Sequence, residues 1–90
     1  PVIVEPDADI QAMVPLLVKG GMYHAGQVCV SVQRVYVHES IVDEVVNEMD
    51  TAARGLKVGD PLLESTEVGP LILPREVERI NDWVQEAKDF

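Results

Sequence analysis

Cys29 is the only cysteine of the chain and lies in the segment HAGQVCVSVQRVYVHES. A nucleophilic thiolate needs an accessible sulfur and nearby donors for the oxyanion that it creates. Cys29 follows a glycine turn, where an expected helix gives way to an expected strand, so backbone amides not yet paired, its own included, could supply those donors. No neighbour in sequence supplies a cation to activate the thiol. A small buried apolar role is the commoner fate of a lone cysteine, and it stays open.

The two histidines offer a second kind of chemistry. His24 lies five residues before Cys29, which raises a Cys–His hydrolase as an alternative, although such partners are usually distant in sequence. His38 precedes Ser40 and is expected on the surface at a strand end. Neither histidine has cysteine or carboxylate neighbours at metal-ligand spacing, so no metal site is predicted. The glycine segments KVGDP and VGPLI match no phosphate-binding loop.

Composition narrows the class of protein further. The chain has 90 residues and a net charge of −9, from 16 acidic and 7 basic side chains. This charge argues against binding to nucleic acid or to an anionic membrane, and no apolar run is long enough for a membrane span. A single cysteine excludes an internal disulfide and fits the reducing cytoplasm. The chain is one small domain at most, and we expect it to be cut from a longer protein.

The elements that must position Cys29 begin with a short buried strand at PVIVE, between two prolines. Asp7 or Asp9 could cap the helix that follows. Pro15 predicts a kink or a late start of that helix, the pair Gly20-Gly21 weakens it, and Gly26 is a plausible terminator. The apolar residues of this helix recur every three or four positions: Ile10, Met13, Val14, Leu17 and Val18.

The second half of the chain predicts one strand and two helices. Alternating valines from Val28 to Val37 predict a strand with a bulge, or one that begins near Val32. Ser40 and Asp43 form a capping-box pattern for a helix that runs to Leu56. Pro74 suits the first position of a last helix. The expected core residues of these helices are Ile41, Val42, Val45, Val46, Met49, Ala52, Ala53 and Leu56, then Val77, Ile80, Trp83, Val84 and Ala87.

The order of these elements predicts an α/β fold. It contains one right-handed βαβ unit with parallel strands, plus two further helices. A parallel sheet normally has helices on both faces and more than two strands. The fold therefore looks incomplete.

Four segments together resemble the aldehyde dehydrogenase superfamily. GQVC followed by QRVYVHESIVDEVV resembles the family's nucleophile motif G-Q-x-C, its R-x-x-V-H strand and its capped helix. PVIVEPDADI resembles the strand and D-A-D turn upstream. KVGDPLLESTEVGPLI resembles the G-D/N-P and G-P landmarks downstream. The resemblance covers essentially the whole chain, and the sequence is most similar to the lactaldehyde- or semialdehyde-type branch.

The resemblance implies a role for particular residues. Cys29 becomes the catalytic nucleophile that attacks a small-molecule aldehyde, and its backbone amide helps to hold the oxyanion. Hydride then passes to NAD or NADP, and water hydrolyses the thioester that remains. Gly26 and Gln27 shape the turn that presents the sulfur, and Arg79 is a candidate contact to the cofactor ribose. The parent enzyme would be a cytoplasmic homo-oligomer.

The chain departs from the family by what it lacks. The general-base Glu of an E-L-G-G stretch, an Asn that donates to the oxyanion and the E-x-F-G-P segment are absent, and so is the dinucleotide-binding domain. Residues 1–90 are therefore expected to form a partial, nucleophile-bearing segment of the catalytic domain that is inactive in isolation. The alternative is an excised or truncated segment with only a structural or interaction role.

Overall fold

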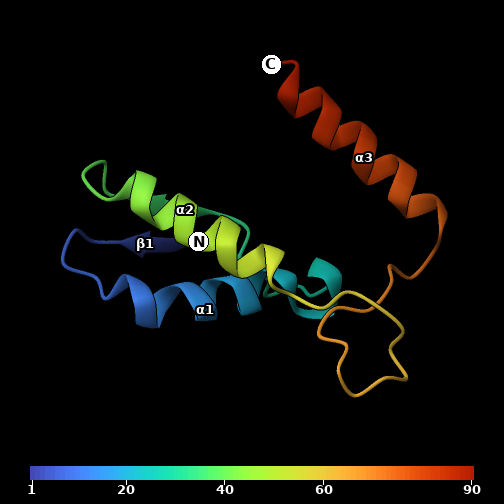
Figure 1. The fold of residues 1–90 in the computed structure, drawn as a ribbon. Coiled ribbons are helices and arrows are strands. Elements are labelled where there is room, and N and C mark those ends of the chain that lie inside the picture. Colours follow the sequence, from blue (N-terminus) through green and yellow to red (C-terminus); the bar gives the residue numbers. More distant parts are fainter.

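The computed structural model describes residues 1–90. The elements follow in the order β1 (Val2–Val4), α1 (Ile10–Met22), the 3₁₀ helix η1 (Tyr23–Gly26), β2 (Val35–Val37), α2 (Val42–Arg54) and α3 (Arg75–Lys88) (Figure 1). The two strands pair in parallel, with Val2 opposite Val35 and Val4 opposite Val37. The βαβ unit with two further helices is therefore confirmed. No helix is both long and apolar enough to cross a membrane.

The core of the molecule lies between α1, α2 and β1. The helices α1 and α2 pack along each other (Figure 1), because each presents apolar residues at helical spacing on one face. Only five of the 90 residues are buried. They are Val4, Val14, Leu17, Val18 and Val45.

Helix α1 begins and ends at positions that its glycines and proline did not predict. The Asp9 carboxylate caps it by accepting from the Ala12 amide at 3.0 Å, so one of the two expected caps is confirmed. The helix contains Pro15 and starts at Ile10, so the expected late start is wrong. It also runs through Gly20, where an added Cβ would lie only 2.8 Å from Val32 Cγ2. Glycine is needed there for a close approach of two segments.

Strand β2 is shorter than the alternating valines predicted. It begins at Val35, and residues 28–34 form a turn and irregular backbone. The reason lies in its partner, because β1 has only three residues and stands between two prolines, which cannot donate to a ladder. Flanking bonds from the Val2 amide to the Arg34 carbonyl (2.9 Å) and from the His38 amide to the Val4 carbonyl (3.1 Å) complete the ladder.

The predicted capping box at Ser40 is wrong. Helix α2 starts at Val42, and no side chain caps it. The Ser40 amide instead donates to His38 Nδ1 at 3.2 Å, and the Ser40 hydroxyl lies 2.9 Å from the same nitrogen. This local bond competes with the cap for the same hydroxyl. Acidic residues in the first turn of α2 still complement the helix dipole.

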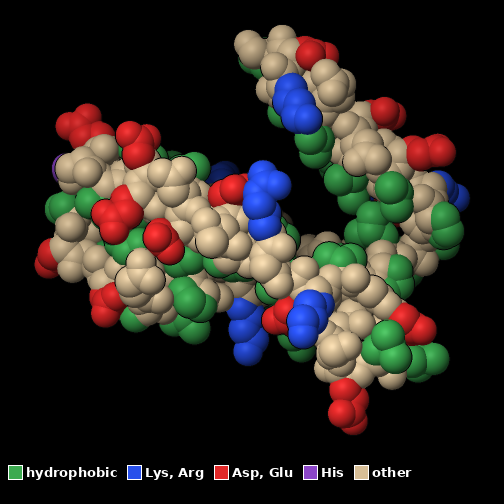
Figure 2. Space-filling model, viewed as in Figure 1, with side chains coloured by type: hydrophobic (Ala, Val, Ile, Leu, Met, Phe, Trp, Pro, Cys, Tyr) green, Lys and Arg blue, Asp and Glu red, His purple; other side chains and the backbone are tan.

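Helix α3 extends away from the rest of the molecule (Figure 1), and none of its residues is buried. Trp83, which was expected in a core, is 58% exposed. Hydrophobic side chains line the side of α3 that faces the body (Figure 2). The chain exposes 7283 Å², whereas a compact protein of 9.9 kDa exposes about 5,200 Å². Its apolar faces are therefore largely uncovered.

Candidate active site

The loop that carries Cys29 starts with an unusual reversal of the chain. After α1 ends, three consecutive residues take left-handed backbone dihedrals, with φ of 49° at His24, 57° at Ala25 and 75° at Gly26. Each of the two non-glycine residues in this region costs roughly 1–2 kcal/mol. Other contacts must therefore hold the loop in this shape.

Cys29 lies in a tight turn directly after this reversal. The Ser31 amide donates to the Val28 carbonyl at 3.0 Å, and the Ser31 hydroxyl donates to the Gly26 carbonyl at 3.3 Å. Cys29 is exposed, so its expected accessibility is confirmed and the buried alternative is wrong. The backbone N–H groups of Val28, Cys29 and Val30 find no acceptor within the chain. They are available to a negatively charged oxygen beside the sulfur.

Gln27 joins this loop to a segment far along the sequence. Its side-chain NH₂ donates to the His24 carbonyl at 2.8 Å and to the Pro70 carbonyl at 3.4 Å. Its side-chain carbonyl accepts from the Ile72 amide at 2.9 Å. Sequence reasoning placed Gln27 in the turn but missed these contacts, since local spacing carries no signal for a partner 45 residues away.

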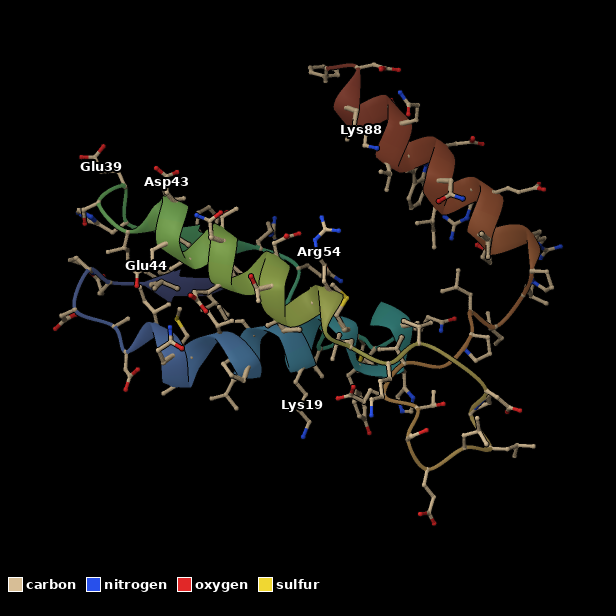
Figure 3. The ribbon with its side chains drawn as sticks, in the orientation of Figure 1. Lys19, Glu39, Asp43, Glu44, Arg54 and Lys88 are labelled. Carbon is tan, nitrogen blue, oxygen red and sulfur yellow. The ribbon has the colours of Figure 1, made fainter.

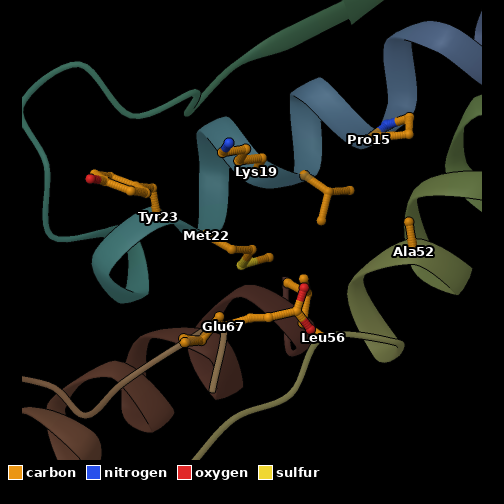
Figure 4. Close-up of a pocket in the computed structure, with 9 residues that line it drawn as sticks. Pro15, Lys19, Met22, Tyr23, Ala52, Leu56 and Glu67 are labelled. Atoms are coloured by element: carbon orange, nitrogen blue, oxygen red, sulfur yellow. The ribbon is translucent and has the colours of Figure 1, made fainter. Parts of the chain in front are cut away.

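Two hollows lie near the loop. The larger, of about 470 Å³, opens between α1, the end of α2 and Glu67–Val68 (Figure 4), and Cys29 does not line it. The smaller, of about 300 Å³, lies against the cysteine loop, since Val28 and Val30 form part of its wall. Its other lining residues are Leu16, Lys19, Gly20, Tyr23 and Ser31. The smaller hollow touches the cysteine loop through Val28, Val30 and Ser31, although Cys29 itself does not line it.

Neither histidine pairs with Cys29. The His24 ring packs against the Tyr23 ring, with centroids 4.2 Å apart, and His38 bonds to Ser40. No hydrogen bond joins either ring to the sulfur, so the Cys–His hydrolase gains no support from the geometry. No group of three metal-ligating side chains occurs in the chain. The Arg54–Asp50 pair on α2 lowers the pKa of that carboxyl through a hydrogen bond, but both side chains belong to the exposed surface of the helix.

Arg79 is occupied within its own helix. Its Nε donates to Glu76 at 2.6 Å, and its guanidinium lies 4.4 Å from the centre of the Trp83 ring. The helix starts offer no phosphate site either. Asp9 caps α1, Asp43 and Glu44 lie in the first turn of α2 (Figure 3), and two glutamates lie in the first turn of α3. Carboxylates repel the phosphates that a helix N-terminus would otherwise bind. These 90 residues therefore do not fit a dinucleotide by themselves.

Comparison with known proteins identifies what the chain is similar to. The family model "Aldehyde dehydrogenase family" matches residues 1–89. A 3-sulfolactaldehyde dehydrogenase of Priestia megaterium is 44% identical over 85 residues, which cover 94% of this chain and 18% of that protein. The chain thus spans less than a fifth of the length of this relative.

Solved structures agree in fold. Glyceraldehyde-3-phosphate dehydrogenase GapN from Methanocaldococcus jannaschii, complexed with NADP, superimposes with a TM-score of 0.94 and 44% identity. The match covers 99% of this chain and 20% of that one. Betaine aldehyde dehydrogenase from Staphylococcus aureus, in complex with NAD+, gives a TM-score of 0.92 and 32% identity, over 99% of this chain and 18% of that one.

Proposed function

Since the chain belongs to the aldehyde dehydrogenase family, we propose that it supplies the nucleophile of an NAD(P)-dependent enzyme that oxidises an aldehyde to a carboxylic acid. The observation that carries the proposal is the position of Cys29. Its side chain is exposed in a turn where the N–H groups of Val28, Cys29 and Val30 have no acceptor. This combination provides both the attacking atom and the donors for the charge that its attack creates.

The step that these residues can perform is the addition of the Cys29 thiolate, once a base outside them has taken the thiol proton. The thiolate sulfur of Cys29 forms a bond to the carbonyl carbon of the aldehyde, and the π electrons of the carbonyl move to its oxygen. The Cys29 amide donates to that oxyanion. The product is the thiohemiacetal oxyanion, and the hydrogen on its carbon is the one that the enzyme must remove as hydride.

We propose that residues 1–90 are the nucleophile-bearing segment of the catalytic domain, and that the dinucleotide-binding domain and the general base lie outside them. The helix starts, filled with carboxylates, support this division. The cofactor of the complete enzyme is NAD or NADP, as in the two solved relatives. Arg79 could contact the cofactor ribose only by leaving Glu76 and Trp83.

We propose that a small polar aldehyde occupies the hollow beside the loop. Lys19, Tyr23 and Ser31 give its wall an ammonium and two hydroxyl groups among apolar side chains, and Lys19 forms no ion pair. The substrate named for the Priestia relative, 3-sulfolactaldehyde, is of this kind. The net charge of −9 disfavours nucleic acid and anionic membranes as partners. We place the complete enzyme in the cytoplasm as a homo-oligomer.

The second candidate is a structural or interaction role without catalysis. The observation that favours it is the large uncovered apolar surface, which includes Trp83 and the exposed middle residues of both strands, Ile3 and Tyr36. Under this alternative, substitution of Cys29 would leave the function of the protein unchanged.

Substitution of Cys29 decides between the two. In the complete enzyme, Cys29→Ser should lower turnover by orders of magnitude and leave NAD(P) binding largely unchanged, since only the covalent step is removed. Val46→Ala, at an exposed site on α2, is the control and should turn over normally. Near-normal aldehyde oxidation by Cys29→Ser would overturn the assignment.

A further inference from the structure

We propose that Gln27 is a positioning residue for the Cys29 thiol, because its carboxamide ties the cysteine loop to the Pro70–Ile72 segment. The inference rests on the proposed function of Cys29. Three side-chain hydrogen bonds carry it: two donated by the NH₂ group, to the His24 and Pro70 carbonyls at 2.8 and 3.4 Å, and one accepted from the Ile72 amide at 2.9 Å.

The loop needs such a restraint because its backbone is strained. His24 and Ala25 both hold left-handed dihedrals, which side chains with a Cβ rarely adopt. The His24 carbonyl receives two bonds from Gln27, one from the side chain and one from the main-chain N–H at 3.1 Å. Gln27, two positions before Cys29, thereby bonds back to His24, the first residue of the reversal.

The other end of the tether is fixed to the helical core. Segment 70–72 follows an isolated parallel bridge between Val58 and Val68. That bridge is reinforced by bonds from the Gly59 amide to the Val68 carbonyl at 3.1 Å and from the Glu67 amide to the Lys57 carbonyl at 2.8 Å. Lys57 lies three residues beyond the end of α2, which packs against α1. The loop is therefore braced against the packed helices from both sides.

Only a carboxamide of this length satisfies all three contacts. A glutamate could still accept from the Ile72 amide, but it would turn a negative charge toward the His24 and Pro70 carbonyls. A leucine of similar size would make none of the bonds. A shift of about 1 Å in a reacting group can cost about 100-fold in rate. Loss of the tether should therefore lower the rate of the chemical step.

The test compares variants of the complete enzyme. Gln27→Leu should lower kcat roughly 10- to 100-fold, with the aldehyde KM and the melting temperature little changed. Gln27→Glu should also lower kcat, since it keeps the contact with Ile72 but repels the His24 and Pro70 carbonyls. Gln33→Leu is the matched control, because Gln33 is exposed and its side chain makes no hydrogen bond. It should keep the wild-type kcat.

A second pair of variants approaches the tether from its far end. Ile72→Pro removes the N–H group that donates to the Gln27 side chain, and it should lower kcat by itself. When it is combined with Gln27→Leu, kcat should fall less than the two single effects together predict, because both substitutions remove the same hydrogen bond. Ile72→Ala keeps that N–H and should turn over normally, since the Ile72 side chain is 82% exposed.

The two proposals fail in different ways. Activity retained in Cys29→Ser would overturn the proposed function itself. If Cys29→Ser is inactive but Gln27→Leu keeps the wild-type kcat per titrated thiol, the tether alone is overturned. The same holds if Gln27→Leu loses only folded protein, because a purely structural role would change the yield and the melting temperature but not kcat.

Discussion

Gly26 carries the backbone dihedral on which the position of Cys29 depends. Its φ is +75°, and an added Cβ would meet only the Gly21 carbonyl, at an ordinary 3.5 Å. Space is therefore available, and the dihedral alone selects glycine. Gly26→Ala should destabilise the complete enzyme by about 1 kcal/mol and lower its turnover, because the loop can relieve the strain only by moving the sulfur.

Denaturant melts and kcat measurements on the same preparations check this. Gly55→Ala is the control, since Gly55 has a helical φ of −74°, where alanine is favoured. A Gly26→Ala enzyme as stable and as active as the wild type would show that the left-handed turn does not set the position of the nucleophile.

Ser40 gives a second prediction at the residue scale. Its hydroxyl bonds to His38 on an exposed surface instead of capping α2. Ser40→Ala should therefore change stability by no more than about 0.5 kcal/mol, well below the cost of losing a helix cap. A loss above about 1 kcal/mol in a denaturant melt would show that Ser40 does cap α2.

Single residues were predicted best where the signal was local. The accessible Cys29 and the Asp9 cap both follow from their immediate neighbours in sequence. The contacts of Gln27 with Pro70 and Ile72 could not be predicted, since they depend on how the segment after α2 folds back. Ser40 was misjudged because two partners competed for one hydroxyl.

At the scale of elements, periodicity predicted the type and order of both strands and all three α-helices, but neither their ends nor the 3₁₀ helix η1. Helix α1 continues through Gly20 because Val32 packs where a side chain would stand. Strand β2 is short because β1 offers a partner for only three residues. The ends of an element thus depend on its neighbours in space, which the local pattern does not contain.

The contact between α1 and the segment before β2 can be tested at Gly20. In an isolated helix, Gly20→Ala would stabilise by about 1 kcal/mol. Here the new Cβ would lie 2.8 Å from Val32 Cγ2, and valine is too stiff to turn away. The Val32 amide also donates to the Gly20 carbonyl at 3.1 Å. We expect a net loss of roughly 1–3 kcal/mol.

A double-mutant cycle isolates this clash. Val32→Ala removes the methyl group that the new Cβ would strike, so Gly20→Ala should cost less in the Val32→Ala background than in the wild type. Thermal melts of the four proteins give the coupling energy. Additive losses would mean that the helix tolerates a side chain at this position.

At the scale of the whole molecule, the chain folds its elements but covers few of their faces. Its radius of gyration is 14.5 Å, against about 12 Å for a compact domain of this length. Each strand has one edge without a partner, and α3 presents apolar residues to solvent. Such surfaces are normally covered by other parts of a protein or by a second copy.

The last prediction follows for the 90-residue chain on its own. It should neither bind NAD tightly nor oxidise aldehydes, because its helix starts carry carboxylates and its cation Arg79 is held by Glu76. It should also self-associate, since Val30 is 81% exposed in an uncharged, valine-rich loop and each strand has an open edge. Calorimetric titration with NAD+ and light scattering measure the two properties, with the complete enzyme as the positive control for binding. A soluble monomer that binds NAD+ with micromolar affinity would show that these residues form a self-sufficient domain.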